Sequence, residues 1–155
     1  MSFNFNPMAA AVRWANGMLG RRAETASRMR QKLQTTLAAL DDDLRSLPAS
    51  IVAANQARQS VAATGQPGLA EAIRQQCDAD LVLVRQLAFA VTGLRSLPEH
   101  ADIELLEQRL REATALTDRI ARMKRRYELV RAQELRERDT IAQQRACALT
   151  EKQTE

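Results

Sequence analysis

Aromatic residues, glycine and proline are all scarce in this sequence. Its 155 residues include three Phe, one Trp, one Tyr, five Gly and four Pro. β-Sandwiches and barrels build their strands from aromatic and β-branched residues and turn the chain about every 8–12 residues. The chain has too few aromatic residues for such strands and too few Gly and Pro for such turns. Ala, Leu, Arg, Gln and Glu, which are strong helix formers, dominate it. These absences exclude an all-β fold and predict an all-α one.

Cysteine and long apolar runs are scarce as well. Cys77 and Cys147 lie far apart without CxxC spacing, so we expect each to be a buried, reduced thiol in a cytoplasmic protein. The most apolar window, residues 81–91, contains Arg85 and Gln86 and falls short of the ~20 residues that a membrane span needs. We therefore expect no transmembrane span.

The side chains that carry catalysis or bind metals are nearly missing. His100 is the only histidine, and no Ser or Cys stands beside it, so a solvated loop residue is a better interpretation than a general base. Metal sites usually draw on several His or Cys ligands. Asp41, Asp42 and Asp43 are adjacent, but consecutive helical residues point in different directions and do not converge on one ion. We expect no enzyme activity, no metal and no cofactor.

Three breaks divide the chain, at Pro48, at residues 64–68 and at Pro98. Proline disfavours helical geometry in the residue before it, and Ser96 with Glu99 matches a capping box at the start of a helix. The first and last helices would be about 60 and 75 Å long, which is typical of coiled coils and extended bundles. The breaks predict four helices, at residues 8–46, 49–63, 68–95 and 98–148.

Apolar residues follow these helices with the spacing of a bundle. In the last helix they recur every seven residues, which is the coiled-coil pattern. Residues 81–91 are apolar around nearly the whole helix, so we expect burial on several sides, with Leu83, Leu87 and Phe89 in the core. Asp80, just before this window, interrupts the apolar stripe of its helix. The heptad positions of the last helix are Leu106, Ala113, Ile120 and Tyr127.

We therefore predict an all-α fold: an elongated helical bundle with antiparallel coiled-coil character and about four helices. Residues 1–155 form a single domain, with flexible ends at residues 1–7 and 150–155. Beyond Val130 the apolar stripe thins, and the last helix is expected to project from the bundle as a charged extension.

The first 29 residues carry most of the aromatic and methionine side chains, together with several arginines and a single acid, Glu24. Such a helix suits an adaptable protein-docking surface. A helix end that caps the core is the simpler interpretation and comes first; after the docking surface follow an anionic membrane surface and an Arg-rich targeting segment. The candidate partner-binding residues are Phe3, Phe5, Met8, Trp14, Met18 and Arg21.

The chain is basic, with 23 Lys and Arg against 19 Asp and Glu, a net charge of +4. A second basic cluster lies in the last helix, on the opposite side from the apolar seam, so we expect a solvated face. Phosphate binding is the alternative, but no stacking aromatics accompany the charges. The cluster consists of Arg119, Arg122, Lys124, Arg125 and Arg126.

Residues 124–142, KRRYELVRAQELRERDTIA, resemble the charged C-terminal helix of the FliJ-like stalk proteins of flagellar and type III export. Those proteins share a KR-rich stretch, alternating Glu and Arg, and then Asp-x-x-Ala. The resemblance implies a long antiparallel helical hairpin and a cytoplasmic, non-enzymatic stalk or chaperone-escort role beside an export ATPase.

Taken together, these features favour a protein that binds other proteins, or another copy of itself, through helix faces. It would be an adaptor, chaperone or structural component of a bacterial assembly, with a secretion or export apparatus as the most specific expectation. The alternative is a basic helical protein that binds nucleic acid or an anionic membrane surface, and we favour nucleic acid least.

Overall fold

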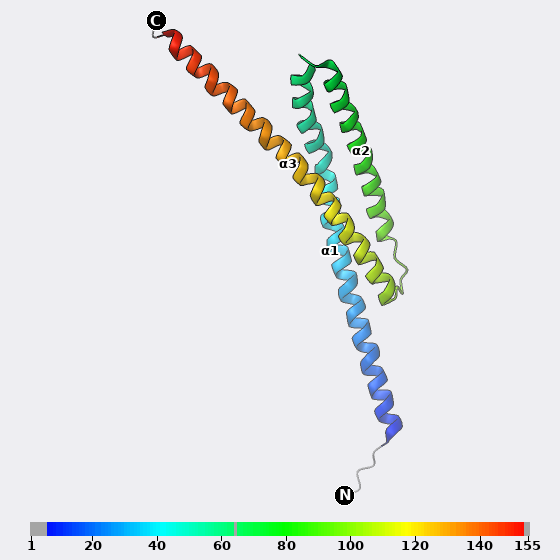
Figure 1. Cartoon of the computed structure of the whole chain (residues 1–155). Coiled ribbons are helices and arrows are strands. Elements are labelled where there is room, and N and C mark those ends of the chain that lie inside the picture. Colours follow the sequence, from blue (N-terminus) through cyan, green and yellow to red (C-terminus); the bar gives the residue numbers. More distant parts are fainter. Residues whose placement is uncertain (1–5, 64, 154–155) are drawn as a thin grey trace.

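The computed structural model describes residues 6–63 and 65–153, and in these residues the fold is all-α. It consists of α1 (Pro7–Ala63), α2 (Pro67–Arg95) and α3 (Ile103–Gln153). Figure 1 shows that α2 turns back along the second half of α1, and that α3 then runs across α1 and diverges from it. The predicted fold class is confirmed, but the expected number of about four helices is wrong, because the structure has three.

The core is built around one face of α1. This helix packs against both α2 and α3, whereas α2 and α3 touch each other only slightly. The heptad positions predicted for the last helix are all buried in α3. On α1 the buried side chains recur every three or four residues, so they line one face of the helix. They are Leu33, Leu37, Leu40, Leu44, Leu47, Ile51 and Ala54.

The helix break expected at Pro48 is absent, because α1 continues through this residue. A proline inside a helix lacks the N–H that would bond to the carbonyl four residues earlier, at a cost of ~3 kcal/mol. Leu44 and Leu47 before the proline and Ile51 after it nevertheless stay buried on the same face. Burial of each such side chain contributes roughly 1.5–3 kcal/mol, so packing across the proline outweighs its local cost.

The connection between α2 and α3 also differs from the prediction. Ser96 is the C-cap of α2 and not the N-cap of the next helix, so the capping box with Glu99 is wrong. The last helix starts at Ile103, where Asp102 accepts a hydrogen bond of 2.8 Å from the Leu105 N–H. An N-cap aspartate satisfies one of the free amides at a helix start, which explains why α3 begins there.

The apolar window at residues 81–91 is buried on one face only. Val84, Leu87 and Val91 lie in the core, and Leu83 is partly buried. Phe89, which we expected in the core, is 82% exposed. The prediction fails because α2 is covered by α1 on one side and has almost no contact with α3.

The helices extend further toward both ends of the chain than expected. Asn6 Oδ1 accepts hydrogen bonds from the N–H groups of Met8 and Ala9, and Pro7 is the first helical residue, so residues 6 and 7 are a capped helix start. At the other end α3 continues to Gln153, past the predicted end at residue 148. The remaining residues of the predicted flexible ends, 1–5 and 154–155, lie outside the described part.

Candidate functional site

The first part of α1 projects from the bundle, and we call residues 7–29 the N-terminal arm. Nearly all of its side chains are exposed, and Leu33 is the first buried residue of the helix. In Figure 1 the arm lies beyond the ends of α2 and α3. The sequence-based alternative in which these side chains cap the core is therefore wrong.

The apolar face of the arm continues the core-facing stripe of α1. Met8, Val12, Leu19 and Ala26 are separated by four, seven and seven residues, and Leu33 follows seven residues later, so all five lie on one side of the helix. Leu33 is covered by the bundle, whereas Met8 is 77% exposed. The arm therefore has the apolar spacing of a helix that packs in a core, but no other helix covers it in the structure.

Trp14 lies on another side of the arm, at least about 100° from each residue of this stripe, and is 65% exposed. At about 100° per residue, Met18 and Arg21 lie on the same side of the helix as Trp14, as expected, whereas Met8 is about 120° away. The expectation that Met8 flanks Trp14 is therefore wrong. Two other predicted partner-binding residues, Phe3 and Phe5, lie outside the described residues.

The second basic cluster is not a uniform solvated face. Arg119, Arg122 and Arg125 are exposed, as predicted. Lys124 instead forms a 2.8 Å ion pair with Asp43 of α1, and this hydrogen bond raises the pKa of the Lys124 ammonium. Arg126 bonds to Asp80 of α2 at 2.6 Å. Two of the five cations therefore hold helices together, and sequence reasoning missed this role.

Asp41, Asp42 and Asp43 point to different partners, as predicted for adjacent helical residues. Asp41 pairs with Arg95 of α2, Asp42 lies 3.8 Å from Arg45 of α1, and Asp43 pairs with Lys124 of α3. The acidic run thus links α1 to both neighbouring helices. Within residues 6–63 and 65–153, no group of three His, Cys, Asp or Glu side chains could hold a metal ion.

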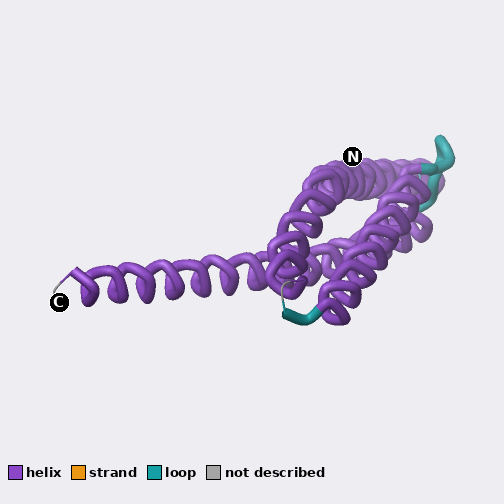
Figure 2. Tube along the Cα trace, turned by 90° about the horizontal axis from the view of Figure 1, so that it is seen from above, coloured by secondary structure: helices purple, strands orange, loops and turns teal. Residues whose placement is uncertain are grey.

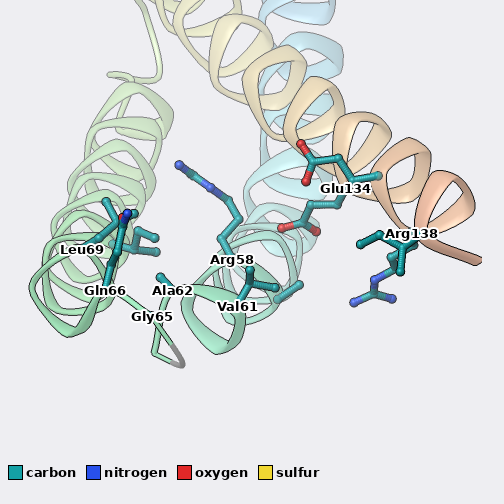
Figure 3. A pocket seen from close by; sticks show the side chains of 12 residues that line it. Arg58, Val61, Ala62, Gly65, Gln66, Leu69, Glu134 and Arg138 are labelled. Carbon is teal, nitrogen blue, oxygen red and sulfur yellow. The ribbon is translucent and has the colours of Figure 1, made fainter. Parts of the chain in front are cut away.

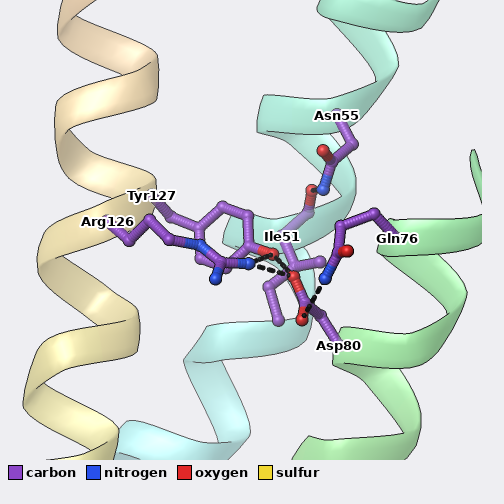
Figure 4. Close-up of polar contacts among 6 residues, drawn as sticks. All are labelled: Ile51, Asn55, Gln76, Asp80, Arg126 and Tyr127. Carbon is purple, nitrogen blue, oxygen red and sulfur yellow. Dashed lines mark hydrogen bonds and ion pairs between the residues drawn. The ribbon is translucent and has the colours of Figure 1, made fainter. Parts of the chain in front are cut away.

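A buried polar cluster connects α2 to α3 (Figure 4). Asp80 is 5% exposed, and its carboxylate accepts hydrogen bonds from Tyr127 Oη, from Arg126 and, at 3.0 Å, from Gln76. Arg126 also lies over the Tyr127 ring, 5.3 Å from its centroid. In the sequence, Asp80 stands within the apolar stripe of one helix, and Tyr127 occupies a heptad position of another. Because they are 47 residues apart, the sequence did not indicate that they meet.

Tyr127 gives this cluster a direct spectroscopic test, because it is the only tyrosine. Burial and the hydrogen bond to Asp80 raise the pKa of its phenol. In the folded protein, ultraviolet absorbance should therefore show phenolate only well above pH ~10, the usual tyrosine value, and in urea the pKa should return to that value. Because the phenol pKa is higher in the folded than in the unfolded chain, its contribution to the free energy of unfolding is fully present below pH ~10, and it is lost as the pH rises further. A folded protein that titrates at the usual value would contradict the cluster.

The remaining reactive side chains, the two cysteines and His100, lie apart from one another. Burial raises the pKa of the partly buried Cys77 thiol, while Cys147 is exposed, so the expected burial is wrong for Cys147. Both cysteines are free. His100 lies exposed in the turn between α2 and α3, as predicted.

A cleft of about 510 Å³ opens where α3 diverges from the tip of the α1–α2 hairpin (Figure 3). We call it the tip cleft. Apolar side chains from all three helices line it, and charged residues from α1 and α3 accompany them. The apolar lining includes Val61, Ala62, Leu69, Ile73 and Ile141, and the charged lining consists of Arg58, Glu134, Glu137 and Arg138.

The two exposed features therefore lie at opposite ends of the hairpin: the arm at one end and the tip cleft at the other. Among the described residues, no helix combines the length and apolar character needed to cross a membrane. No protein-family model matches the chain, and neither does a curated protein or a solved structure.

Proposed function

We propose that this chain is a non-enzymatic interaction protein that binds other proteins through exposed helix faces. The observation that carries the proposal is the N-terminal arm, whose apolar stripe runs in register with the core stripe of α1 but remains exposed. Apolar helix faces of this kind are buried in stable assemblies, and Trp and Arg are frequent anchors of protein interfaces. Trp14, Met18 and Arg21 supply these anchors on a second side of the arm, next to the apolar stripe.

The spacing of the arm favours a helical partner. A stripe with heptad spacing packs best against another helix, in the manner of a coiled coil. We extend this interpretation to the fold and regard α1 and α2 as an antiparallel coiled-coil hairpin with an unpaired end. The arm carries several arginines and only one acid, so a partner helix with acidic flanks fits it best.

The cellular role that we propose is that of an adaptor, chaperone or structural component of a bacterial assembly in the cytoplasm. Support for a secretion or export apparatus comes only from the resemblance of residues 124–142 to FliJ-like stalk proteins. The proposal involves no catalysis, because the ionisable side chains that the fold brings together from different helices, such as Asp80, Arg126 and Tyr127, bond to one another.

A second candidate function is contact with an anionic membrane surface. Arg13, Arg21, Arg22 and Arg28 accompany the apolar stripe of the arm, and a basic amphipathic helix binds such a surface by burying its apolar face. Nucleic-acid binding has less support, because Lys124 and Arg126 of the second basic cluster are paired with acids.

The fluorescence of Trp14, the only tryptophan, tests the proposal. Immobilised wild-type protein and a Trp14→Ala/Met18→Ala variant are compared for the proteins they retain from a bacterial lysate, and the retained partner is then purified and titrated. We expect Trp14 emission typical of an exposed indole in dilute protein, a blue shift on binding, and at least about tenfold weaker binding by the variant, equivalent to ~1.4 kcal/mol.

The matched control is Phe89→Ala, which removes an exposed aromatic side chain from α2 and should bind like the wild type. Equal retention of the partner by the Trp14→Ala/Met18→Ala variant would contradict the proposal. A blue shift with vesicles containing an anionic lipid, but none with the purified partner, would favour the membrane alternative.

A further inference from the structure

We propose that the tip cleft is the docking site for the N-terminal arm of a second copy of this chain, so that the molecules associate head to tail. This inference rests on the proposed function, because it names the partner of the arm. The arm and the cleft lie at opposite ends of the hairpin, so one chain cannot satisfy both within itself (Figure 1).

The cleft has the surface that an inserted helix needs. Ala62, Ala70 and Ile73 form a small core at the hairpin tip, separate from the main one. Leu69 beside it and Ile141 on the facing part of α3 remain about half exposed. An added helix between these walls would bury apolar surface from all three helices and extend the main core to the end of the hairpin.

Glu134 has a carboxylate oxygen that no donor of the cleft reaches in the structure. Its Oε1 atom is shielded from solvent and accepts no hydrogen bond in the structure. A shielded carboxylate oxygen without a donor is unfavourable, and such atoms are rare in native proteins. In Figure 3 Glu134 extends from α3 toward α1, whereas Arg58 extends toward α2 and the Arg138 guanidinium points away from Glu134. Neither arginine of the lining bonds to this oxygen, so a docked molecule can supply the donor.

The arm of a second copy can supply both the apolar surface and the donor. Met8 and Val12 belong to its apolar stripe, and Arg13 is the first charged side chain along the sequence. A helix that enters the cleft by its N-terminal end would therefore place apolar side chains against Leu69 and Ile141, and the Arg13 guanidinium near Glu134 and Glu137. A guanidinium that donates to a carboxylate makes a strong, charge-assisted hydrogen bond.

The lengths of the two exposed segments agree with this arrangement. The arm and the part of α3 beyond Val130 each contain about 23 residues, or about 34 Å of helix. The arm of one copy could lie along the exposed end of α3 of the other, in the same direction. Figure 2 shows this end of α3 leaving the bundle as a single helix.

Pairing two arms with each other would be a poorer solution. It would bring the arginines of one arm against those of the other, and like charges at close range are destabilising. Head-to-tail docking lessens this repulsion, because the exposed end of α3 carries four acids beside its five basic residues. It also leaves one free arm and one free cleft on every complex, so the contact is heterologous and builds open chains unless a ring closes.

A charge exchange tests the inference. Sedimentation velocity is recorded for the full chain from about 1 to 200 μM. We expect the wild type to grow beyond a dimer with concentration, and Arg13→Glu or Glu134→Arg to raise the concentration of half-assembly at least about tenfold, ~1.4 kcal/mol. The double variant Arg13→Glu/Glu134→Arg should recover assembly, because the pair is restored with reversed charges. An equal mixture of the two single variants should assemble into chains in which the variants alternate, because each arm then meets a cleft of opposite charge.

Two controls make the result specific. Arg125→Glu makes the same change at an exposed site outside the arm and the cleft, and should assemble like the wild type. Glu134→Gln keeps the shape of the side chain and should weaken assembly less than Glu134→Arg; circular dichroism checks that each variant is helical. A chain that stays monomeric to 200 μM, stops at a dimer or is not rescued by the double variant would overturn the inference. If a monomeric chain still binds another protein through Trp14, only this inference fails, and the proposed function stands.

Discussion

Replacing Leu87 by alanine is expected to lower the free energy of unfolding by about 3 kcal/mol, within the roughly 2–5 kcal/mol typical of such changes in a core. The side chain is 2% exposed and packs in the main core. Truncation removes apolar contacts and leaves a cavity that the long, stiff helices cannot close. Urea unfolding followed by circular dichroism should show a midpoint about 1–2 M below that of the wild type, given the usual dependence on denaturant.

Phe89→Ala provides the matched comparison, because Phe89 lies two residues further along the same helix and is exposed. We expect its urea midpoint to equal that of the wild type, since surface substitutions usually change stability by less than ~0.5 kcal/mol. A large loss for Phe89→Ala with little loss for Leu87→Ala would mean that α2 is rotated relative to the arrangement described above.

Replacing Asp80 by leucine is expected to cost about 2–3 kcal/mol, although leucine is apolar and of suitable size. Tyr127 Oη would remain inside the bundle without its acceptor, and a buried hydroxyl without a partner costs about 1–3 kcal/mol. Arg126 would contribute little to the loss, because about half of its side chain is exposed and can be solvated.

The double variant Asp80→Leu/Tyr127→Phe should recover most of this stability, because it removes both polar groups together. Tyr127→Phe alone should cost about 1 kcal/mol, since Asp80 keeps Arg126 and Gln76 as donors. Urea unfolding of the wild type, both single variants and the double variant gives the coupling between the two residues, which we expect to be about 2 kcal/mol or more. Additive effects would contradict a direct hydrogen bond.

Periodicity in the sequence was enough to predict the all-α fold and the core face of α3. Helix type and burial at three- and four-residue spacing are local properties, so Leu106, Ala113 and Ile120 could be assigned without a structure. The fate of Pro48 could not be predicted in this way. Its local effect is to end a helix, and only the packing of Leu44, Leu47 and Ile51 against other helices decides that α1 continues.

Phe89 and Asp80 show a second limit of sequence reasoning. An all-round apolar helix predicts burial on several sides only if several neighbours are present, and the sequence does not reveal how α3 is angled to α2. The same angle decides which polar residues meet. Asp80 and Tyr127 come together because α3 crosses the bundle at this level, and nothing in either segment alone indicates the other.

Of the two candidate interaction surfaces, the arm was partly predictable from the sequence, and the tip cleft was not. The bias of aromatic and methionine residues toward the first 29 positions suggested a surface role only as an alternative to capping the core, and Trp14 and Met18 are exposed in the structure. The tip cleft was not predictable, because it results from the divergence of α3. Glu134 and Ile141 were read only as parts of a charged extension, and their proximity to Leu69 is a tertiary property.

The continuity of α1 means that one helix contains two regions of different local stability. Around Leu37 and Leu44 the backbone can open only when the bundle unfolds, whereas the arm, which includes Gly17 and Gly20, is held by little more than its own helix propensity. Each glycine costs ~1 kcal/mol relative to alanine, so the arm should fray without disturbing the bundle. Amide hydrogens of the arm would then exchange with solvent long before those of the core. A docked partner would appear as a gain in protection in the arm, and a second copy of the chain would add protection around the tip cleft.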